Sequence, residues 1–189
     1  MHKYKSLLIF FSGIALFLVL CCFPISFDNN DDQAMYFISS GVLSGLPSPN
    51  IAQTNLILGL ILKEIFSFSD EINWYTVYLQ LIQCASLLTI YLPLIYNKGI
   101  NLLLSSLVLI FLLLGFSVLC IVKLQYTIVA LLSCTTALCC LYSELPGRKK
   151  YLLASFFIIA MILIRKDSFY IFIGFNIPFL LIKFIKREY

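Results

Sequence analysis

The sequence predicts an all-α integral membrane protein with about six transmembrane helices. Hydrophobic residues make up 61% of the chain, charged residues make up 12%, and the mean hydropathy is +1.00. A soluble domain usually carries about 25% charged residues. Several apolar runs also approach the ~20 residues that a helix needs to cross a bilayer. We therefore expect one membrane domain over residues 1–189, with much of its surface facing lipid.

The apolar runs place the predicted spans along the chain. Their approximate bounds are 7–27, 74–96, 100–122, 126–142, 151–164 and 169–182. Trp74 and Tyr96 suit the two ends of the second span, because aromatic residues gather at membrane interfaces. Residues 165–167 carry three charges between the last two runs, and charges inside a bilayer are costly. These residues therefore predict a tight turn between two short spans.

Charge asymmetry orients the predicted spans. With a cytoplasmic N-terminus and six crossings, most of the thirteen Lys and Arg residues fall inside, and most of the nine carboxylates fall outside. Cytoplasmic loops of membrane proteins are enriched in Lys and Arg. We therefore expect a multi-pass protein of the bacterial plasma membrane with both termini in the cytoplasm. No soluble face gathers basic residues, so no nucleic-acid partner is expected.

The first outer loop, residues 28–73, predicts two interfacial helices in series. It opens on the polar cluster Asn29-Asn30-Asp31-Asp32. Asn30 or Asp31 can cap a helix that runs to about Ser44, because their side-chain oxygens accept the free amides of a first turn. Asn50 can cap a second helix, over 51–66, whose apolar core is too short to span. Such a helix lies along a membrane interface.

Short motifs carry a family resemblance over about residues 7–182. They are Asn30-Asp31-Asp32, Ser40-Gly41, Gly45-Leu46-Pro47, Asn55, Gly59, Trp74-Tyr75, Leu124-Gln125-Tyr126-Thr127 and Ile164-Arg165. In this order they resemble the N-terminal module of uncharacterised bacterial members of the GT-C superfamily. Those proteins are polytopic glycosyltransferases that use polyprenyl-phosphate sugars. They are usually much longer, so the resemblance also implies that this chain can be the N-terminal part of a longer protein.

Carboxylates and cations predicted on the same side of the membrane make a candidate transfer site. Asp31 or Asp32 is the candidate catalytic residue, because a carboxylate can take the proton of an acceptor hydroxyl. For the donor phosphate we expect Lys123, Arg165 and Lys166, and for a sugar hydroxyl Gln125. Arginine binds phosphate in a bidentate manner and lysine binds it as a point charge.

Each of these residues also has a structural interpretation. Asp31 can act only as a helix cap. Lys123 can extend from a helix end toward water. Arg165 and Lys166 can form an ordinary turn that Asp167 neutralises.

The sequence does not predict a metal site of the zinc type. None of the seven cysteines forms a C-x-x-C pair, and the single histidine, His2, lies in the N-terminal tail. Asp31 and Asp32 together could hold a divalent cation through oxygen ligands, and this alternative stays open.

The favoured function is a GT-C-type glycosyltransferase, or its N-terminal part. It would transfer a sugar from a polyprenyl-phosphate donor to a cell-envelope glycan, lipid or protein on the outer membrane face. The expected partners are therefore the lipid bilayer, the donor and the acceptor. The alternatives are a non-catalytic membrane subunit or transporter for lipid-linked glycans, and an inactive fragment.

Overall fold

The computed structural model describes residues 26–96, 102–111, 122–143, 145 and 148–185, with isolated positions between 7 and 18. Its elements are β1 (Ser26–Phe27), α2 (Asn30–Ser40), α3 (Leu56–Phe68), α4 (Trp74–Tyr96), α5 (Leu102–Phe111), β2 (Lys123–Leu124), α7 (Tyr126–Tyr142), α8 (Lys149–Ile164) and α9 (Ser168–Ile185). Most of the predicted first span and about half of the third lie outside the described residues.

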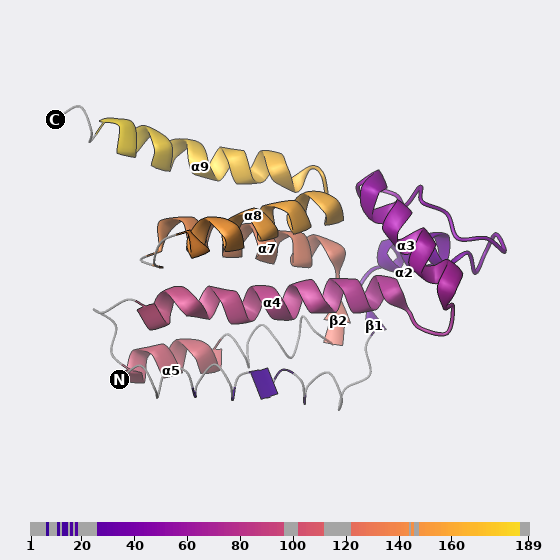
Figure 1. Ribbon diagram of the computed structural model, residues 1–189, viewed down its shortest axis with the longest axis horizontal. Coiled ribbons are helices and arrows are strands. Elements are labelled where there is room, and N and C mark those ends of the chain that lie inside the picture. Colours follow the sequence, from indigo (N-terminus) through magenta and orange to yellow (C-terminus); the bar gives the residue numbers. More distant parts are fainter. Residues whose placement is uncertain are drawn as a thin grey trace.

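Four helices form a bundle. Helices α4, α7, α8 and α9 lie side by side with similar axis directions, and α2 and α3 lie at one end of them (Figure 1). Helices α7 and α8 make the most extensive contact, and α4 packs against α7. Buried alanines line these contacts: Ala130 and Ala137 on α7, and Ala154 and Ala160 on α8. Such small side chains allow the helix backbones to approach closely.

The main hydrophobic core joins the bundle to the two end helices. From α2 and α3 it takes Met35, Leu58, Leu62 and Phe66, and from the bundle Tyr75, Leu79, Tyr126, Val129, Ala160 and Ile164. Helices α2 and α3 therefore bury one apolar face each in the protein itself, although Leu60, Ile61 and Phe68 on the rest of α3 stay exposed. The prediction of two interfacial helices in an outer loop is wrong for this reason.

The ends of α2 and α3 follow from local chemistry. Helix α2 stops at Gly41, whose φ of 78° and N–H bond to the carbonyl of Phe37 make a left-handed cap. Helix α3 begins at Leu56, because the Asn55 side chain accepts the N–H of Ile57 at 3.0 Å. The predicted end near Ser44 and the predicted start at residue 51 are thus wrong, since several nearby residues offer similar cap signals.

The prediction of six membrane spans is also wrong. Among the described residues, only α4 contains a stretch long and apolar enough to cross a membrane, Trp74–Leu92, and 56% of that stretch is buried inside the protein. Helices α7 and α8 have 17 and 16 residues. At about 1.5 Å per residue they are roughly 25 Å long, short of the ~30 Å hydrocarbon core of a bilayer.

The predicted localisation depended on those spans. Apolar composition cannot by itself distinguish a buried helix from a membrane span. Helices α7 and α8 bury Val129, Cys134, Phe157 and Met161 against their neighbours. Part of the apolar content of the chain therefore makes helix–helix contacts. With one candidate span among the described residues, itself mostly buried, the prediction of a multi-pass plasma-membrane protein with cytoplasmic termini is wrong.

A short parallel strand pair places the starts of two helices next to each other. Ser26 of β1 pairs with Lys123 of β2, and Phe27 pairs with Leu124. The N–H of Asp28 extends the pairing by donating to the carbonyl of Leu124 at 3.0 Å. The chain passes from β1 into α2 and from β2 into α7. Parallel pairing therefore brings the first turn of α2 to the first turn of α7.

Candidate functional site

The side chain of Asp32 lies at the meeting point of these two helix starts. It is fully buried, although it belongs to the first turn of α2. Its Oδ1 accepts the backbone N–H of Tyr126 at 3.0 Å and the hydroxyl of Tyr75 at 3.3 Å. Its other oxygen, Oδ2, is buried and has no hydrogen-bond partner among the described residues. A buried oxygen without a partner has a cost that a proton or a bound group would remove.

The surroundings of Asp32 favour its protonated form. Burial raises the pKa of its carboxyl to about 6, and the charges of Asp31 and Asp28 add to the rise. The hydrogen bonds from Tyr126 and Tyr75 oppose the rise, because they stabilise the carboxylate. A carboxyl with a pKa near 6 is mostly ionised at neutral pH and binds a proton readily. These are the properties of a useful acid/base group.

Tyr126, the first residue of α7, links this carboxyl to three other parts of the chain. Its backbone N–H binds Asp32, and its hydroxyl donates to Oε1 of Gln53 in the loop between α2 and α3. The guanidinium of Arg165 lies over its ring, with Cζ 5.7 Å from the ring centroid. That distance is within the range of a cation–π contact.

Arg165 is held beside the start of α7 from the end of α8. It is the C-cap residue of that helix, and its Nη1 donates to Oγ1 of Thr127 at 2.9 Å. No carboxylate in the part of the chain that the structure describes forms an ion pair with it. A guanidinium has five N–H donors, so most of them remain for an anion. The predicted acid, Asp32, thus binds the backbone of Tyr126, and the predicted cation, Arg165, contacts the Tyr126 ring and the Thr127 hydroxyl. Both groups therefore meet at the first two residues of α7.

The other predicted site residues lie around this centre with their side chains less enclosed. Asp31 and Lys166 are exposed, and Lys123 is exposed in β2. Gln125 is partly buried as the N-cap of α7, but its side chain makes no capping hydrogen bond. Asp31 is not the cap of α2, since Asn29 holds that position without a side-chain bond. The roles proposed for these four residues stay predictions.

The two neighbouring aspartates have different environments. Asp31 faces water, whereas Asp32 is enclosed by Tyr75 and Tyr126. Among the described residues, no group of three or more His, Cys, Asp or Glu side chains is arranged to hold a metal ion.

Sequence reasoning did not assign site roles to Tyr75, Tyr126, Thr127 and Gln53. The first three fall within the motifs Trp74-Tyr75 and Leu124-Gln125-Tyr126-Thr127, so a signal for them was present. For Gln53 there was none. It takes a left-handed backbone conformation with φ 60°, which is uncommon for a non-glycine residue.

Comparisons of the chain with protein-family models, with curated proteins and with solved structures found no match.

Proposed function

We propose that the chain is a glycosyltransferase, or the N-terminal part of one. It would transfer a sugar from a polyprenyl-phosphate donor to a cell-envelope glycan, lipid or protein. One observation carries the proposal: an acid with a pKa near 6 and an arginine that has no carboxylate partner in the described part of the chain meet at Tyr126. Sugar transfer from a phosphate needs these two groups together.

In the proposed reaction the acceptor hydroxyl oxygen attacks the anomeric carbon of the donor sugar. The bond from that carbon to the phosphate oxygen breaks, and its electron pair stays on the phosphate. The acceptor proton passes to Oδ2 of Asp32, the oxygen to which no described residue donates a hydrogen bond. Arg165 stabilises the charge that grows on the phosphate. Because Oδ2 is buried here, the site must open to admit the acceptor.

The test is a transfer assay on the purified full chain with a panel of labelled polyprenyl-phosphate sugars. Asp32→Asn keeps the shape of the side chain and its ability to accept the Tyr126 N–H, but it removes the base. Transfer should fall by about 10²–10⁴-fold, the usual range for a general acid/base group. Arg165→Lys keeps the charge and loses the planar fork, so donor binding should weaken about tenfold.

Two neighbouring residues provide matched controls. Asp31→Asn changes an exposed carboxylate one residue away, and Lys166→Gln changes an exposed cation one residue from Arg165. Both should keep most of the activity. If Asp31→Asn lost transfer activity while Asp32→Asn kept it, the acid/base role would belong to Asp31 instead. Wild-type activity in both Asp32→Asn and Asp31→Asn would rule out a carboxylate mechanism at this site.

A second candidate is a non-catalytic protein that binds lipid-linked glycans. The contact of Arg165 with Thr127 and Tyr126 supports it, because an anion site requires only the cation. This function predicts saturable donor binding that Arg165→Gln weakens and Asp32→Asn leaves unchanged. It also predicts no transfer by the wild type to any acceptor. Transfer by the wild type would exclude it.

A further inference from the structure

A pocket of about 430 Å³ opens between α7, α8 and α9, well away from Asp32. Its size falls within the ~300–1,000 Å³ typical of small-molecule sites. Tyr142, at the last turn of α7, and Lys150, near the start of α8, both line it. Tyr126 lies at the opposite end of α7, whose 17 residues span roughly 25 Å. The pocket is therefore a separate place from the proposed transfer site.

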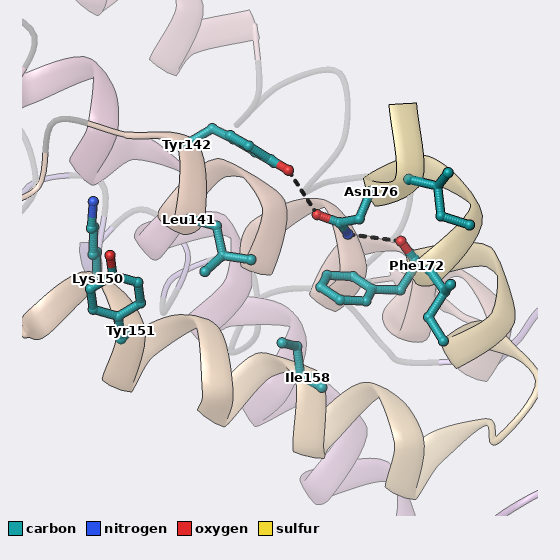
Figure 2. A pocket seen from close by; sticks show the side chains of 9 residues that line it. Leu141, Tyr142, Lys150, Tyr151, Ile158, Phe172 and Asn176 are labelled. Carbon is teal, nitrogen blue, oxygen red and sulfur yellow. Dashed lines mark hydrogen bonds between the residues drawn. The ribbon is translucent and has the colours of Figure 1, made fainter. Parts of the chain in front are cut away.

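The middle of the pocket is apolar. Leu141, Ile158 and Phe172 form its walls, one from each of the three helices, and Figure 2 shows Leu141 and Ile158 between the two ends. Phe172 is buried, while Leu141 and Ile158 are partly exposed along the pocket. A hydrocarbon chain placed here would remove this surface from water, which contributes about 25 cal/mol per Å².

One end of the pocket is polar but already satisfied by the protein. The hydroxyl of Tyr142 donates to Oδ1 of Asn176 at 3.0 Å. Nδ2 of Asn176 donates to the carbonyl of Phe172 at 2.8 Å (Figure 2). Both polar groups of this buried amide thus have partners. This end therefore closes the pocket and does not call for a charged ligand group.

The other end carries the one charged side chain among the residues that line the pocket, Lys150. Its Nζ lies 5.0 Å from the ring centroid of Tyr151, which keeps the ammonium at this end (Figure 2). Arg148 and Lys149 precede it and are exposed, so the local charge is positive. An anionic group would be attracted to this end and not to the Asn176 end.

From this arrangement we infer that the pocket binds a single-chain amphiphile with one anionic head group. The head, a carboxylate or a phosphate monoester, pairs with Lys150. The chain runs between Leu141 and Ile158 toward Phe172 and ends near the Asn176–Tyr142 pair. The inference does not depend on the proposed transferase activity, since it uses none of the residues around Tyr126.

The experiment measures binding of four probes to the purified full chain by calorimetry or by displacement of a fluorescent fatty acid. The probes are dodecanoate, dodecyl phosphate, dodecanol and inorganic phosphate. Any detergent present is non-ionic and kept at one concentration for all samples. Both charged amphiphiles, or one of them, should bind saturably at one site. Dodecanol should bind at least tenfold more weakly, and inorganic phosphate should not compete. The stronger of the two charged probes identifies the head group.

Substitutions at Lys150 and Ile173 test the head group and the chain of the ligand separately. Lys150→Gln should weaken binding of the charged probe about tenfold or more, and Lys150→Arg should largely restore it. Lys149→Gln, one residue earlier and outside the pocket, is the matched charge control. Ile173→Trp adds bulk at the partly exposed wall and should block the chain of every probe. Ile159→Trp makes the same change at an exposed position of α8 that does not line the pocket.

Several results would overturn the inference. Equal binding of dodecanoate, dodecyl phosphate and dodecanol would show that no charged head group is recognised. Equal affinities of the wild type and Lys150→Gln for the charged probe would show that Lys150 does not bind the head group. Binding that Ile173→Trp and Ile159→Trp change alike would place the ligand elsewhere. No saturable binding of any probe to the folded wild type would mean that the pocket is only a packing defect. Arg165→Gln should leave the affinity for dodecanoate unchanged, which separates this site from the proposed donor phosphate site.

Discussion

Asp32 makes hydrogen bonds with the described residues through only one of its two carboxylate oxygens. Oδ1 binds the N–H of Tyr126, a free donor at the start of α7, so this side chain acts as a cap for a helix other than its own. A purely structural cap needs no more than that oxygen. Within the part of the chain that the structure describes, Oδ2 remains buried and without a hydrogen-bond partner. Residues that reduce stability in this way are often retained for function.

The pH dependence of stability tests the state of Asp32. Its pKa rises from an ordinary 3.8 to about 6 in the folded protein. Below pH 3.8 the carboxyl is protonated in both states. As the pH rises further, the unfolded chain releases the proton first, so the free energy of unfolding falls and then levels off above about pH 7. A rise of about two pKa units corresponds to about 3 kcal/mol.

Asp32→Asn removes this titration and should therefore become more stable relative to the wild type as the pH rises. The difference in unfolding free energy should grow by up to about 3 kcal/mol between about pH 4 and pH 7. Chemical denaturation at a series of pH values measures it. A difference for Asp32→Asn that stays constant with pH would contradict the raised pKa.

At the scale of the elements, the loop between α2 and α3 packs closely on α3 because position 59 is a glycine. Gly59, in the first turn of α3, is buried against the backbone of Pro49. A Cβ at this glycine would lie 1.9 Å from the carbonyl oxygen of Pro49, so the loop or the helix would have to move. The same loop carries Gln53, the partner of the Tyr126 hydroxyl. The close contact of α3 with the loop therefore positions one edge of the candidate site.

Gly59→Ala should destabilise the protein by about 1–3 kcal/mol, the usual cost of overpacking a tight contact. It should also make the loop around Gln53 more sensitive to a protease, because the loop is displaced from α3. The control is Gly174→Ala in α9, where an added Cβ meets nothing within 4 Å. That change should stabilise the protein by up to about 1 kcal/mol, since alanine favours helix over glycine. Equal thermal shifts for the two variants would contradict the tight contact.

At the scale of the whole molecule, Tyr126 joins segments that are far apart in the sequence. It contacts Asp32 of α2, Gln53 of the following loop and Arg165 at the end of α8. Its ring also belongs to the main core that connects the bundle with α2 and α3. The candidate site therefore exists only when these parts are assembled.

Two substitutions at Tyr126 separate its contacts. Tyr126→Phe loses only the hydroxyl bond to Gln53, so the free energy of unfolding should fall by about 1 kcal/mol. Tyr126→Leu also loses the ring beneath Arg165 and should cost clearly more, since cation–π contacts and core packing are both reduced. Denaturation curves of the two variants give both values. Identical stability of Tyr126→Phe and Tyr126→Leu would show that the Arg165–ring contact contributes nothing.

The positions of several helices could be predicted from local sequence, but their environment could not. The apolar runs 74–96 and 126–142 coincide with α4 and α7. On α8, however, apolar residues occupy both faces: Phe157 is buried, while Leu152 is 70% exposed and Ile159 is 57% exposed. Such a helix shows no amphipathic period, and a uniformly apolar run was therefore interpreted as a membrane span.

The sequence by itself determined where apolar helices form and which residue types are available for caps and for acid, cation and amide chemistry, but the choice of Gly41 and Asn55 among several cap candidates came from the structure. Those properties depend on neighbours within a few positions. Only the tertiary structure decided that Asp32 is buried while Asp31 is exposed, and that Arg165 lies over Tyr126. These outcomes follow from the pairing of Ser26 with Lys123 and from the packing of α8 on α7. Contacts between such distant residues leave no periodic signal in the sequence, because each depends on the assembled core.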